Sequence, residues 1–425
     1  MVNYMIKKIA LFLPDILRKR GGGSSTYIYN LRLGIEKIAD KISEDIFRIE
    51  NLEINFIHCG IKESLEEVSK DIAYLSKYQK LYIFLKNLAS QNPIIYVNFL
   101  LFYRLRKLLN KNLSFLKICD VINFQDPFSL YFTKKKLKNK KIKMNLTIHS
   151  PDDPVVEIKN ASYFYSKDNL FSKLLHHIYP FKVLQRISNQ GIAFADYLIY
   201  PTKEAIDVHF NTIPLIKTIY SENHNKFLYC ITGCPPLKNE KSREEIRSML
   251  GFKKDDFVIL FIGRHNEYKG FDILLEAVIE LRKKYRDIYL VSAGKGPLSE
   301  KHANYQEFWK YLGFVENVGD LINAADVHCI PNRESYFDIG LVESLSIGTP
   351  IITTYTGGHK FFKDKSRGLV VINPNKEELI KAIEYLKNIP EGLKEIMKEE
   401  NKKFYQQNFT LENFALNYIS TLKKP

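Results

Sequence analysis

The sequence predicts a mixed α/β protein of two halves, each with a largely parallel sheet covered by helices. Three observations support this. The chain has 425 residues, which is too long for one ordinary domain and suits two of about 200 residues each. Short apolar segments alternate with amphipathic helical segments, as is typical of layered α/β folds. The apolar segments are nearly continuous, as in strands buried on both faces of a parallel sheet.

The expected strands follow one another along both halves. In the first half they are Lys8–Pro14, Ile54–Cys59, Val121–Gln125, Met144–His149 and Asp196–Pro201. The second half is expected to restart with a strand and to continue with five more, namely Phe227–Ile231, Phe257–Gly263, Ile288–Gly294, Val327–Pro331, Pro350–Thr354 and Gly368–Ile372.

Helices are expected between these strands, because apolar residues recur there at helical spacing. One stripe comprises Phe271, Leu274, Leu275, Val278 and Leu281, and another comprises Leu379, Ala382, Ile383 and Leu386. Asn375, with Glu378 three residues later, predicts the N-terminus of a helix. A third stripe in the tail comprises Leu411, Phe414, Ala415, Tyr418, Ile419 and Leu422.

The boundary between the halves is expected between Ile213 and Asn239, where Pro235-Pro236 interrupts the pattern. We therefore predict an N-terminal domain over residues 1–225, a C-terminal domain over 226–405 and a closing helical segment over 406–425.

Composition limits the class of protein. The formal charge is +15 and the pI is near 9.2, which indicates an anionic partner: nucleic acid, a phosphate-bearing substrate or an acidic membrane face. The five cysteines are scattered and lack zinc-site spacing, so we expect buried free thiols in a reducing cytoplasm. The N-terminus lacks the pattern of a signal peptide, and no uncharged apolar run reaches the roughly 18 residues of a transmembrane helix. We expect a soluble or peripheral protein.

Two cations follow the strand that ends at Gly263. Arg264 and Lys269 share the loop between this strand and the helix after Gly270. Open α/β sheets bind ligands at the carboxyl ends of their strands, and Arg and Lys suit phosphate oxygens. The next strand ends in Gly294-Lys-Gly-Pro, a weak signal by itself, whose glycines permit close approach of the backbone to a ligand.

A carboxylate lies in the first turns of another predicted helix. This helix starts near Gly340 and ends at Gly348, after which Pro350 opens a strand. Glu343 is in its early part. A carboxylate there can accept hydrogen bonds from the hydroxyls of a ligand, or it can merely interact favourably with the helix dipole, by about 0.3–1 kcal/mol.

With these segments the chain resembles family 4 of the retaining glycosyltransferases (glycosyltransferases group 1). The resemblance implies the GT-B fold, in which two Rossmann-like domains face each other across a cleft and a C-terminal helix crosses back to the N-terminal domain. It also implies that the C-terminal domain binds a nucleotide-sugar and that the N-terminal domain binds the acceptor.

The resemblance assigns roles to single residues. Phe261–Ala277 resembles the family's "GR…KG" segment, so Arg264 and Lys269 are expected to hold the donor diphosphate and to act in catalysis. Tyr311–Ser335 resembles the stretch "flGfv…l…aDvfv.PS", which places Phe314 and Val315 near the base. Glu343 is expected to bind the ribose. The remaining expected donor contacts in this half are Gly263, Gly294, Gly340 and Leu341.

The sequence departs from the family pattern where the donor sugar is usually bound. The family has two glutamates with seven residues between them, but counting back from Glu343 gives Ser335, and Glu334 comes one residue too early. Phe337 keeps the usual aromatic, whereas Asp338 stands where Gly is common. Glu334, Ser335 and Asp338 are therefore alternative candidates for the sugar contact.

Two segments of the first half also match the family. Gly22 and Gly23 lie in a glycine-rich loop before a helix, resembling the "GG" loop that faces the donor phosphates. His149 ends a strand and resembles the family histidine that contacts the donor sugar, so we count it with the catalytic residues. Gln125 stands where the family commonly has a second histidine.

The sequence therefore predicts a glycosyltransferase that moves a sugar from a nucleotide-sugar to a glycan or lipid-linked acceptor, in cell-surface polysaccharide biosynthesis. We expect neither metal nor organic cofactor, because cations and helix-terminal N–H groups can stabilise the leaving diphosphate. The basic run Lys134–Lys143 is either a solvated face or, with the aromatic and basic stretch Glu63–Leu116, a surface for the inner face of the cell membrane. An epimerase or phosphorylase of the same fold remains the alternative, and nucleic-acid binding has only the charge in its favour.

Overall fold

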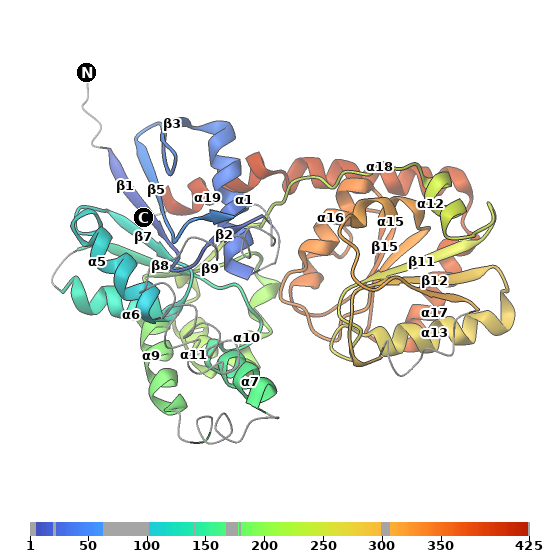
Figure 1. Ribbon diagram of the computed structural model, residues 1–425, viewed down its shortest axis with the longest axis horizontal. Helices are drawn as coiled ribbons and strands as arrows, with labels where there is room; N and C mark the ends of the chain where they lie inside the picture. Colours follow the sequence, from blue (N-terminus) through green and yellow to red (C-terminus); the bar gives the residue numbers. More distant parts are fainter. Residues whose placement is uncertain are drawn as a thin grey trace, which may run out of the picture. The chain divides into compact units, whose positions relative to one another are not determined.

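The computed structural model describes residues 6–19, 23–62, 102–138, 141–166, 177, 180–298 and 307–423. The chain forms two compact α/β units, each described by itself below (Figure 1). The first comprises Met1–Tyr200, His209–Cys230 and Ala415–Pro425, and the second comprises Pro201–Val208 and Ile231–Phe414.

The first unit contains an eight-stranded sheet. In sheet order its strands are β10 (Phe227–Tyr229), β9 (Tyr197–Tyr200), β8 (Lys143–Thr147), β7 (Val121–Phe124), β1 (Lys7–Phe12), β5 (Leu52–Ile57), β4 (Ile46–Ile49) and β3 (Asp40–Ser43). Neighbours are parallel from β10 to β5, whereas β4 and β3 pair in antiparallel fashion at one edge. Because β10 pairs with β9, the expectation that Phe227–Ile231 opens the second half was wrong.

Helices and short segments complete the first unit. They are β2 (Leu17–Arg18), α1 (Gly23–Ile38), β6 (Ile61–Lys62), α5 (Arg104–Leu116), α6 (Pro127–Lys136), α7 (Pro154–Ser166), α9 (Phe181–Phe194), α10 (His209–Thr212), α11 (Pro214–Glu222) and η3 (His224–Lys226). The last helix, α19 (Leu411–Lys423), joins this unit from Ala415 onward. Its Tyr418 is fully buried and accepts a hydrogen bond from the Asn123 side chain of β7, which confirms the apolar stripe expected in the tail.

The second unit contains a six-stranded sheet in which all neighbours are parallel. In sheet order its strands are β13 (Trp309–Tyr311), β12 (Ile288–Ala293), β11 (Phe257–Ile262), β14 (Val327–Ile330), β15 (Ile351–Thr354) and β16 (Leu369–Ile372). Its helical segments are η2 (Glu204–Ile206), α12 (Arg243–Met249), α13 (Phe271–Lys284), α15 (Val318–Ala324), α16 (Ile339–Ile347), η4 (Gly357–Phe362), α17 (Lys376–Asn388) and α18 (Glu391–Asn408). The two parallel-stranded units confirm the predicted α/β class.

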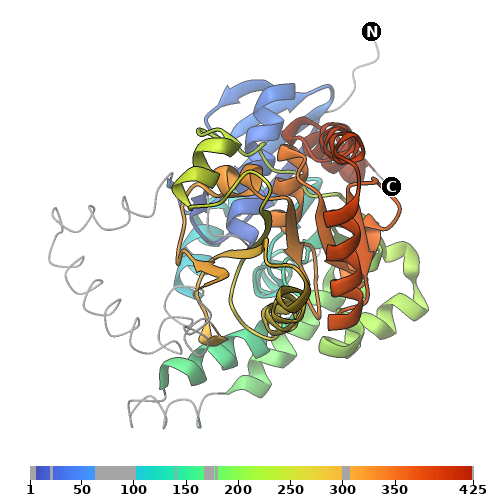
Figure 2. The same ribbon diagram turned by 90° about the vertical axis from the view of Figure 1, so that its right-hand side faces the viewer.

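Helices cover both faces of this second sheet. Figure 1 shows α13 and α17 on one face and α12, α15 and α16 on the other, and Figure 2 shows the gold helix α13 nearly end-on. The predicted stripes explain the packing, because Leu274, Val278, Leu379 and Ile383 are all fully buried in one core cluster. This apolar burial stabilises the layers by about 25 cal/mol per Å² of surface removed from water.

The strand order of the second sheet places a ligand site. From β11 the chain continues outward through β12 to β13, and it then returns to the other side of β11 to form β14, β15 and β16. The order therefore reverses between β11 and β14. In open α/β sheets, ligands bind at the carboxyl ends of the strands on either side of such a reversal.

Candidate functional site

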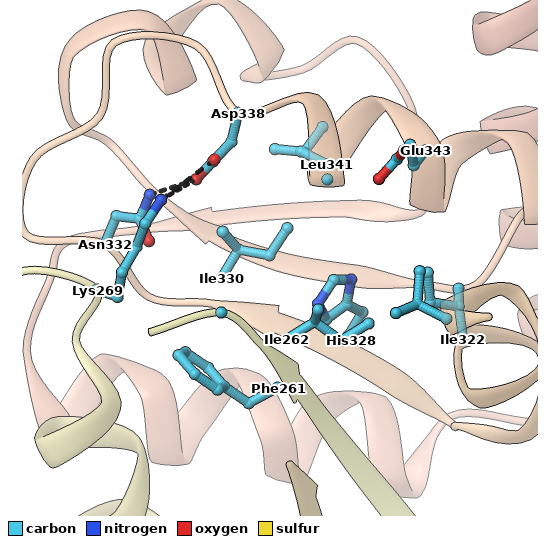
Figure 3. Close-up of a pocket in the computed structure, with 13 residues that line it drawn as sticks. Phe261, Ile262, Lys269, Ile322, His328, Ile330, Asn332, Asp338, Leu341 and Glu343 are labelled. Carbon is cyan, nitrogen blue, oxygen red and sulfur yellow. Dashed lines mark hydrogen bonds and ion pairs between the residues drawn. The ribbon is translucent and has the colours of Figure 1, made fainter. Parts of the chain in front are cut away.

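A pocket lies at this reversal in the second unit (Figure 3). Its walls come from the carboxyl ends of β11 and β14, the loops that follow them, and helices α15 and α16. The lining residues are Phe261, Ile262, Gly263, Lys269, Val318, Ile322, His328, Ile330, Asn332, Asp338, Gly340, Leu341 and Glu343.

The loop after β11 is a tight turn that fixes the position of Lys269. The Asn266 side chain accepts a hydrogen bond from the Lys269 backbone N–H at 3.0 Å. Gly270 then begins α13 with φ 68°, and a Cβ there would lie 1.9 Å from the Pro331 carbonyl oxygen. Only glycine tolerates both this backbone conformation and this contact. The turn thus requires the glycine that directly follows Lys269.

Asp338 is the partner of Lys269 inside the pocket. The Lys269 Nζ lies 2.9 Å and 3.2 Å from the two carboxylate oxygens, and Asn332 Nδ2 donates to the same carboxylate at 2.6 Å (Figure 3). The buried His359 lies 3.7 Å from it. Burial alone would raise the pKa of Asp338, but Lys269, His359 and the hydrogen bonds from Lys269 and Asn332 together lower it below its usual value. Asp338 is therefore an ionised carboxylate at neutral pH.

The N-terminus of α16 opens toward the same pocket. Asp338 is its N-cap residue, but the Asp338 side chain makes no cap hydrogen bond. The next two residues begin the helix, and a Cβ at Gly340 would meet no atom of the described residues within 4 Å. Uncapped N–H groups and the positive end of a helix dipole favour an anion. Open space at Gly340 lets such an anion come close.

The opposite end of the pocket carries Glu343 and Ile322. Figure 3 shows both residues on the far side from Lys269, Asp338 and Asn332. Glu343 is on α16 and is half-buried. The pocket therefore has a carboxylate from α16 at one end and a cation with its counter-ion at the other, with apolar side chains between them.

His328 of β14 lies in the floor of the pocket. Its Nδ1 lies 2.6 Å from the Ser344 hydroxyl of α16. Burial lowers the pKa of His328 to about 4, although the Asp338 charge acts in the opposite direction. The ring is therefore neutral near pH 7.

Close backbone contacts between glycines support the rim of the pocket. Gly294 follows β12 with φ 123°, and a Cβ there would lie 1.9 Å from the Gly263 carbonyl oxygen. The Gly294 N–H also donates to the Gly313 carbonyl at 2.6 Å. These glycines let the loops after β11, β12 and β13 pack directly on one another.

The structure brings half of the expected donor-binding residues of this unit together. Those that line the pocket are Gly263, Lys269, Asp338, Gly340, Leu341 and Glu343. Those that do not line it are Arg264, Gly294, Phe314, Val315, Glu334 and Ser335.

The residues outside the pocket differ in exposure. Arg264 is exposed and forms no ion pair with any residue that the structure describes, and the Phe314 side chain is 75% exposed. Val315 packs against a core cluster. Ser335 is buried, and its carbonyl accepts the Gly358 N–H at 2.9 Å. Glu334 is half-buried beside it.

Sequence reasoning missed Asn332 and His328. Asn332 comes just after β14 and Pro331. A polar residue at the carboxyl end of a parallel strand indicates a possible ligand contact, so this position could have been found from the sequence. His328 lies inside an otherwise apolar strand, where nothing in the sequence distinguishes a pocket residue from a core histidine.

The first unit places His149 beside α1 and β7. His149 Nε2 lies 2.8 Å from Gln125 Oε1, and its ring meets the edge of Tyr27 on α1 at a centroid distance of 4.7 Å. Burial lowers the pKa of His149 to about 3, so the ring is neutral and Nε2–H donates to the amide oxygen. Gln125 thus orients His149. Gly23 begins α1 with φ 65° in open space, whereas Gly22 lies outside the described residues.

Other expectations concern cysteines and membranes. Four of the five free cysteines are buried as expected, but Cys59 is exposed. Among the described residues, none of the helices has the length and apolar character needed to span a bilayer.

Comparison with known proteins identifies the second unit. Residues 256–388 match the family model described as glycosyl transferases group 1. The chain carries a group 1 glycosyltransferase domain. This match confirms the family expected from the sequence, and the matched segment of the glycosyltransferase domain contains every residue that lines the pocket.

One relative and one solved fold illustrate the likeness. The chain is 27% identical over 272 residues to alpha-monoglucosyldiacylglycerol synthase of Acholeplasma laidlawii. The aligned segment covers 60% of this chain and 66% of the synthase, which is just under two thirds of the length of that protein. Alr3699/HepE of Anabaena has a similar fold. In complex with UDP it gives a TM-score of 0.61 at 12% identity, covering 98% of this chain and 99% of that one. In complex with UDP-glucose it gives 0.57 at 13% identity, with 98% and 99% covered.

Proposed function

We propose that the protein is a retaining glycosyltransferase that moves a sugar from a nucleotide-sugar to a glycan or lipid-linked acceptor. The observation that carries the proposal is the pocket at the strand reversal, where Lys269 and the open N-terminus of α16 come together within the family segment. A cation and a free helix N-terminus are what a diphosphate needs. A structural neighbour in complex with UDP supports the same choice of ligand.

The proposed donor lies along the pocket from one end to the other. The nucleoside takes the Glu343 end, where the carboxylate accepts the ribose hydroxyls. The diphosphate takes the end with Lys269 and the first turn of α16, and the exposed Arg264 joins it there. These groups stabilise the negative charge that develops on the departing diphosphate. The first unit is proposed to bind the acceptor, with His149 contacting the transferred sugar.

The phosphate assignment is tested with Arg264→Ala and Lys269→Ala. Each variant is expected to bind UDP about 10- to 100-fold more weakly, because a hydrogen bond to a charged group contributes about 1.5–3 kcal/mol. Isothermal titration calorimetry measures this affinity. Lys284→Ala, which removes a lysine paired with Glu384 on the surface, is the matched control. Unchanged UDP affinity in both site variants would refute the assignment.

Sugar transfer separates the proposal from an epimerase or a phosphorylase of the same fold. The purified protein is incubated with labelled UDP-sugar and candidate lipid or glycan acceptors, and the products are separated. A transferase gives labelled acceptor together with UDP. An isomerised donor without acceptor product would identify an epimerase, and a sugar phosphate formed from inorganic phosphate would identify a phosphorylase.

We also propose that a basic surface on α5 and α6 contacts an anionic membrane at the inner face of the cell membrane. The two helices are neighbours, because the Lys136 side chain donates to Asn110 of α5. Arg106, Lys107 and Lys111 are exposed on α5. Each basic side chain near an anionic bilayer contributes about 1 kcal/mol. The relative named as a glucosyldiacylglycerol synthase supports a lipid acceptor.

Vesicle flotation tests the membrane proposal. The protein is expected to float with vesicles containing phosphatidylglycerol at low salt and to stay at the bottom with pure phosphatidylcholine. The double variant Lys107→Glu/Lys136→Glu is expected to lose most of this binding, while Lys398→Glu on α18 serves as the control. Absence of binding to anionic vesicles at low salt would contradict the proposal.

A further inference from the structure

Asn332 carries a buried hydrogen-bond acceptor that has no partner in the part of the chain that the structure describes. The residue follows β14, is 1% exposed and lines the pocket. Its Nδ2 donates to Asp338 at 2.6 Å, whereas its Oδ1 has no partner among the described residues. The orientation of the amide is fixed by chemistry, because an ionised carboxylate only accepts hydrogen bonds and must face the NH₂ group. Oδ1 is therefore the acceptor that remains.

The unpaired oxygen restricts what part of a donor can reach it. Phosphate oxygens of an ionised diphosphate only accept hydrogen bonds, so they cannot satisfy Oδ1. A hydroxyl or an N–H group can. The nucleoside carries such groups, but it is assigned to the Glu343 end of the pocket, opposite to Asn332 (Figure 3). The hydroxyls of the transferred sugar are the donors that remain at this end.

Asp338 adds a second acceptor at the same place. Its carboxylate is 2.6 Å from Asn332 Nδ2 and 2.9 Å from Lys269 Nζ. When Lys269 turns to the diphosphate, a carboxylate oxygen becomes free to accept from a sugar hydroxyl. The same negative charge opposes a sugar that carries a carboxylate, since like charges in a partly buried site repel strongly.

We propose that Asn332, together with Asp338, recognises a hydroxyl of the transferred sugar and selects neutral sugars over uronic acids. This inference rests on the proposed function, because it requires a nucleotide-sugar in the pocket. It assigns Asn332 a role in specificity that neither the sequence pattern nor the diphosphate chemistry supplies.

The test compares ligands with and without the sugar. UDP and UDP-glucose are titrated by calorimetry into the full-length wild type and into Asn332→Leu, which keeps the branched shape of the side chain but removes both polar atoms. UDP-glucose affinity is expected to fall about 10-fold, while UDP affinity changes less than twofold. UDP-glucuronate is expected to bind wild type at least 10-fold more weakly than UDP-glucose, and Asp338→Asn is expected to reduce that difference.

Deoxy analogues locate the hydroxyl. UDP-glucose analogues that lack one sugar hydroxyl each are titrated into wild type and Asn332→Leu. One analogue is expected to bind wild type about 10-fold more weakly than UDP-glucose, yet to bind the variant as UDP-glucose does. Asn332→Ser, a smaller change, is measured in parallel, and thermal unfolding confirms that both variants fold.

Each contrary outcome has a separate meaning. Parallel losses of UDP and UDP-glucose affinity in both variants would show that Asn332 only holds Asp338, which overturns the inference. Equal losses for every deoxy analogue in wild type and variant would overturn it as well. If wild type binds none of UDP, ADP and GDP, the proposed function itself fails, a result distinct from either of these.

Discussion

Removing the Asp338 charge is expected to strengthen binding of UDP. In the free protein, Asp338 holds Lys269 at 2.9 Å, and an incoming phosphate must compete with it. A phosphate oxygen bonded to the same Nζ at ~2.8 Å would lie about 5.5 Å from the carboxylate. At an effective dielectric constant of about 20, two unit charges at that distance repel by about 3 kcal/mol.

Solvent screening reduces this figure. The side chains of Asp338 and Lys269 are 27% and 29% exposed, so we expect a net effect of roughly 1–2 kcal/mol. Asp338→Asn should therefore bind UDP about 5- to 30-fold more tightly. Sugar transfer should become slower, because the same variant loses an acceptor for the sugar. Opposite changes in UDP affinity and in turnover are the signature of this residue.

Calorimetric titration of UDP at low and high salt measures the effect, and the difference between variant and wild type should shrink at high salt. The matched control is Asp287→Asn, which removes a lysine-paired carboxylate at the amino end of β12, on the opposite edge of the sheet. UDP affinity that falls in Asp338→Asn, or that rises equally in the control, would refute the reasoning.

Two further predictions concern stability. Gly270→Ala should destabilise the second unit by about 2–4 kcal/mol in urea denaturation, because φ is 68° and the Cβ would lie 1.9 Å from a carbonyl oxygen. The control Gly251→Ala has φ 72° but no described atom near its Cβ, and it should cost only about 1 kcal/mol. Similar losses in the two variants would contradict this. Burial lowers the pKa of His265, His328 and His359 from 6.5 to about 4. Below pH 6.5 the unfolded chain binds protons that the folded unit does not, so the free energy of unfolding should be about 4 kcal/mol lower at pH 5.5 than at pH 7.5. A constant value over this range would show that these rings titrate normally.

Much of the second unit could be predicted because its signals are local. The α13 and α17 stripes have helical period, Asn375 caps α17 through the Glu378 N–H at 2.9 Å, and Gly348 ends α16 with φ 96°. Each feature depends on a few neighbouring residues. The sequence therefore specifies where these elements begin and end.

The elements that were missed or misplaced depend on distant partners. The expected strand Phe227–Ile231 was recognised as a strand but assigned to the wrong half. Its apolar pattern contains no information on which strand it pairs with, and in the structure it pairs with β9. The antiparallel edge strands β3 and β4 have four residues each, too few for a periodic signal.

The same limit applies to the pocket. Its cation, its helix N-terminus and Glu343 follow from segments with recognisable order. The contact between Asp338 and Lys269 joins residues 69 positions apart, and no local pattern encodes it. A carboxylate in place of the common glycine could be noticed in the sequence, but its partner could not.

Asn332 and Asp338 are in direct contact, and this makes the coupling of their substitutions predictable. Asp338 stands where the family commonly has Gly, and its carboxylate accepts a hydrogen bond from Asn332 Nδ2 at 2.6 Å. Asn332→Ser alone leaves the Asp338 carboxylate with a poorer hydrogen-bond donor. Asp338→Gly alone removes the acceptor of Asn332 Nδ2, so that neither polar atom of the buried amide has a partner among the described residues. The double variant removes both costs. Each single variant is expected to lose binding free energy for UDP-glucose. The loss in the double variant is expected to be about 1 kcal/mol smaller than the sum of the two single losses, a coupling typical of residues in contact. Strict additivity would mean that the two substitutions are independent, and the shared role in sugar recognition would then have to be abandoned.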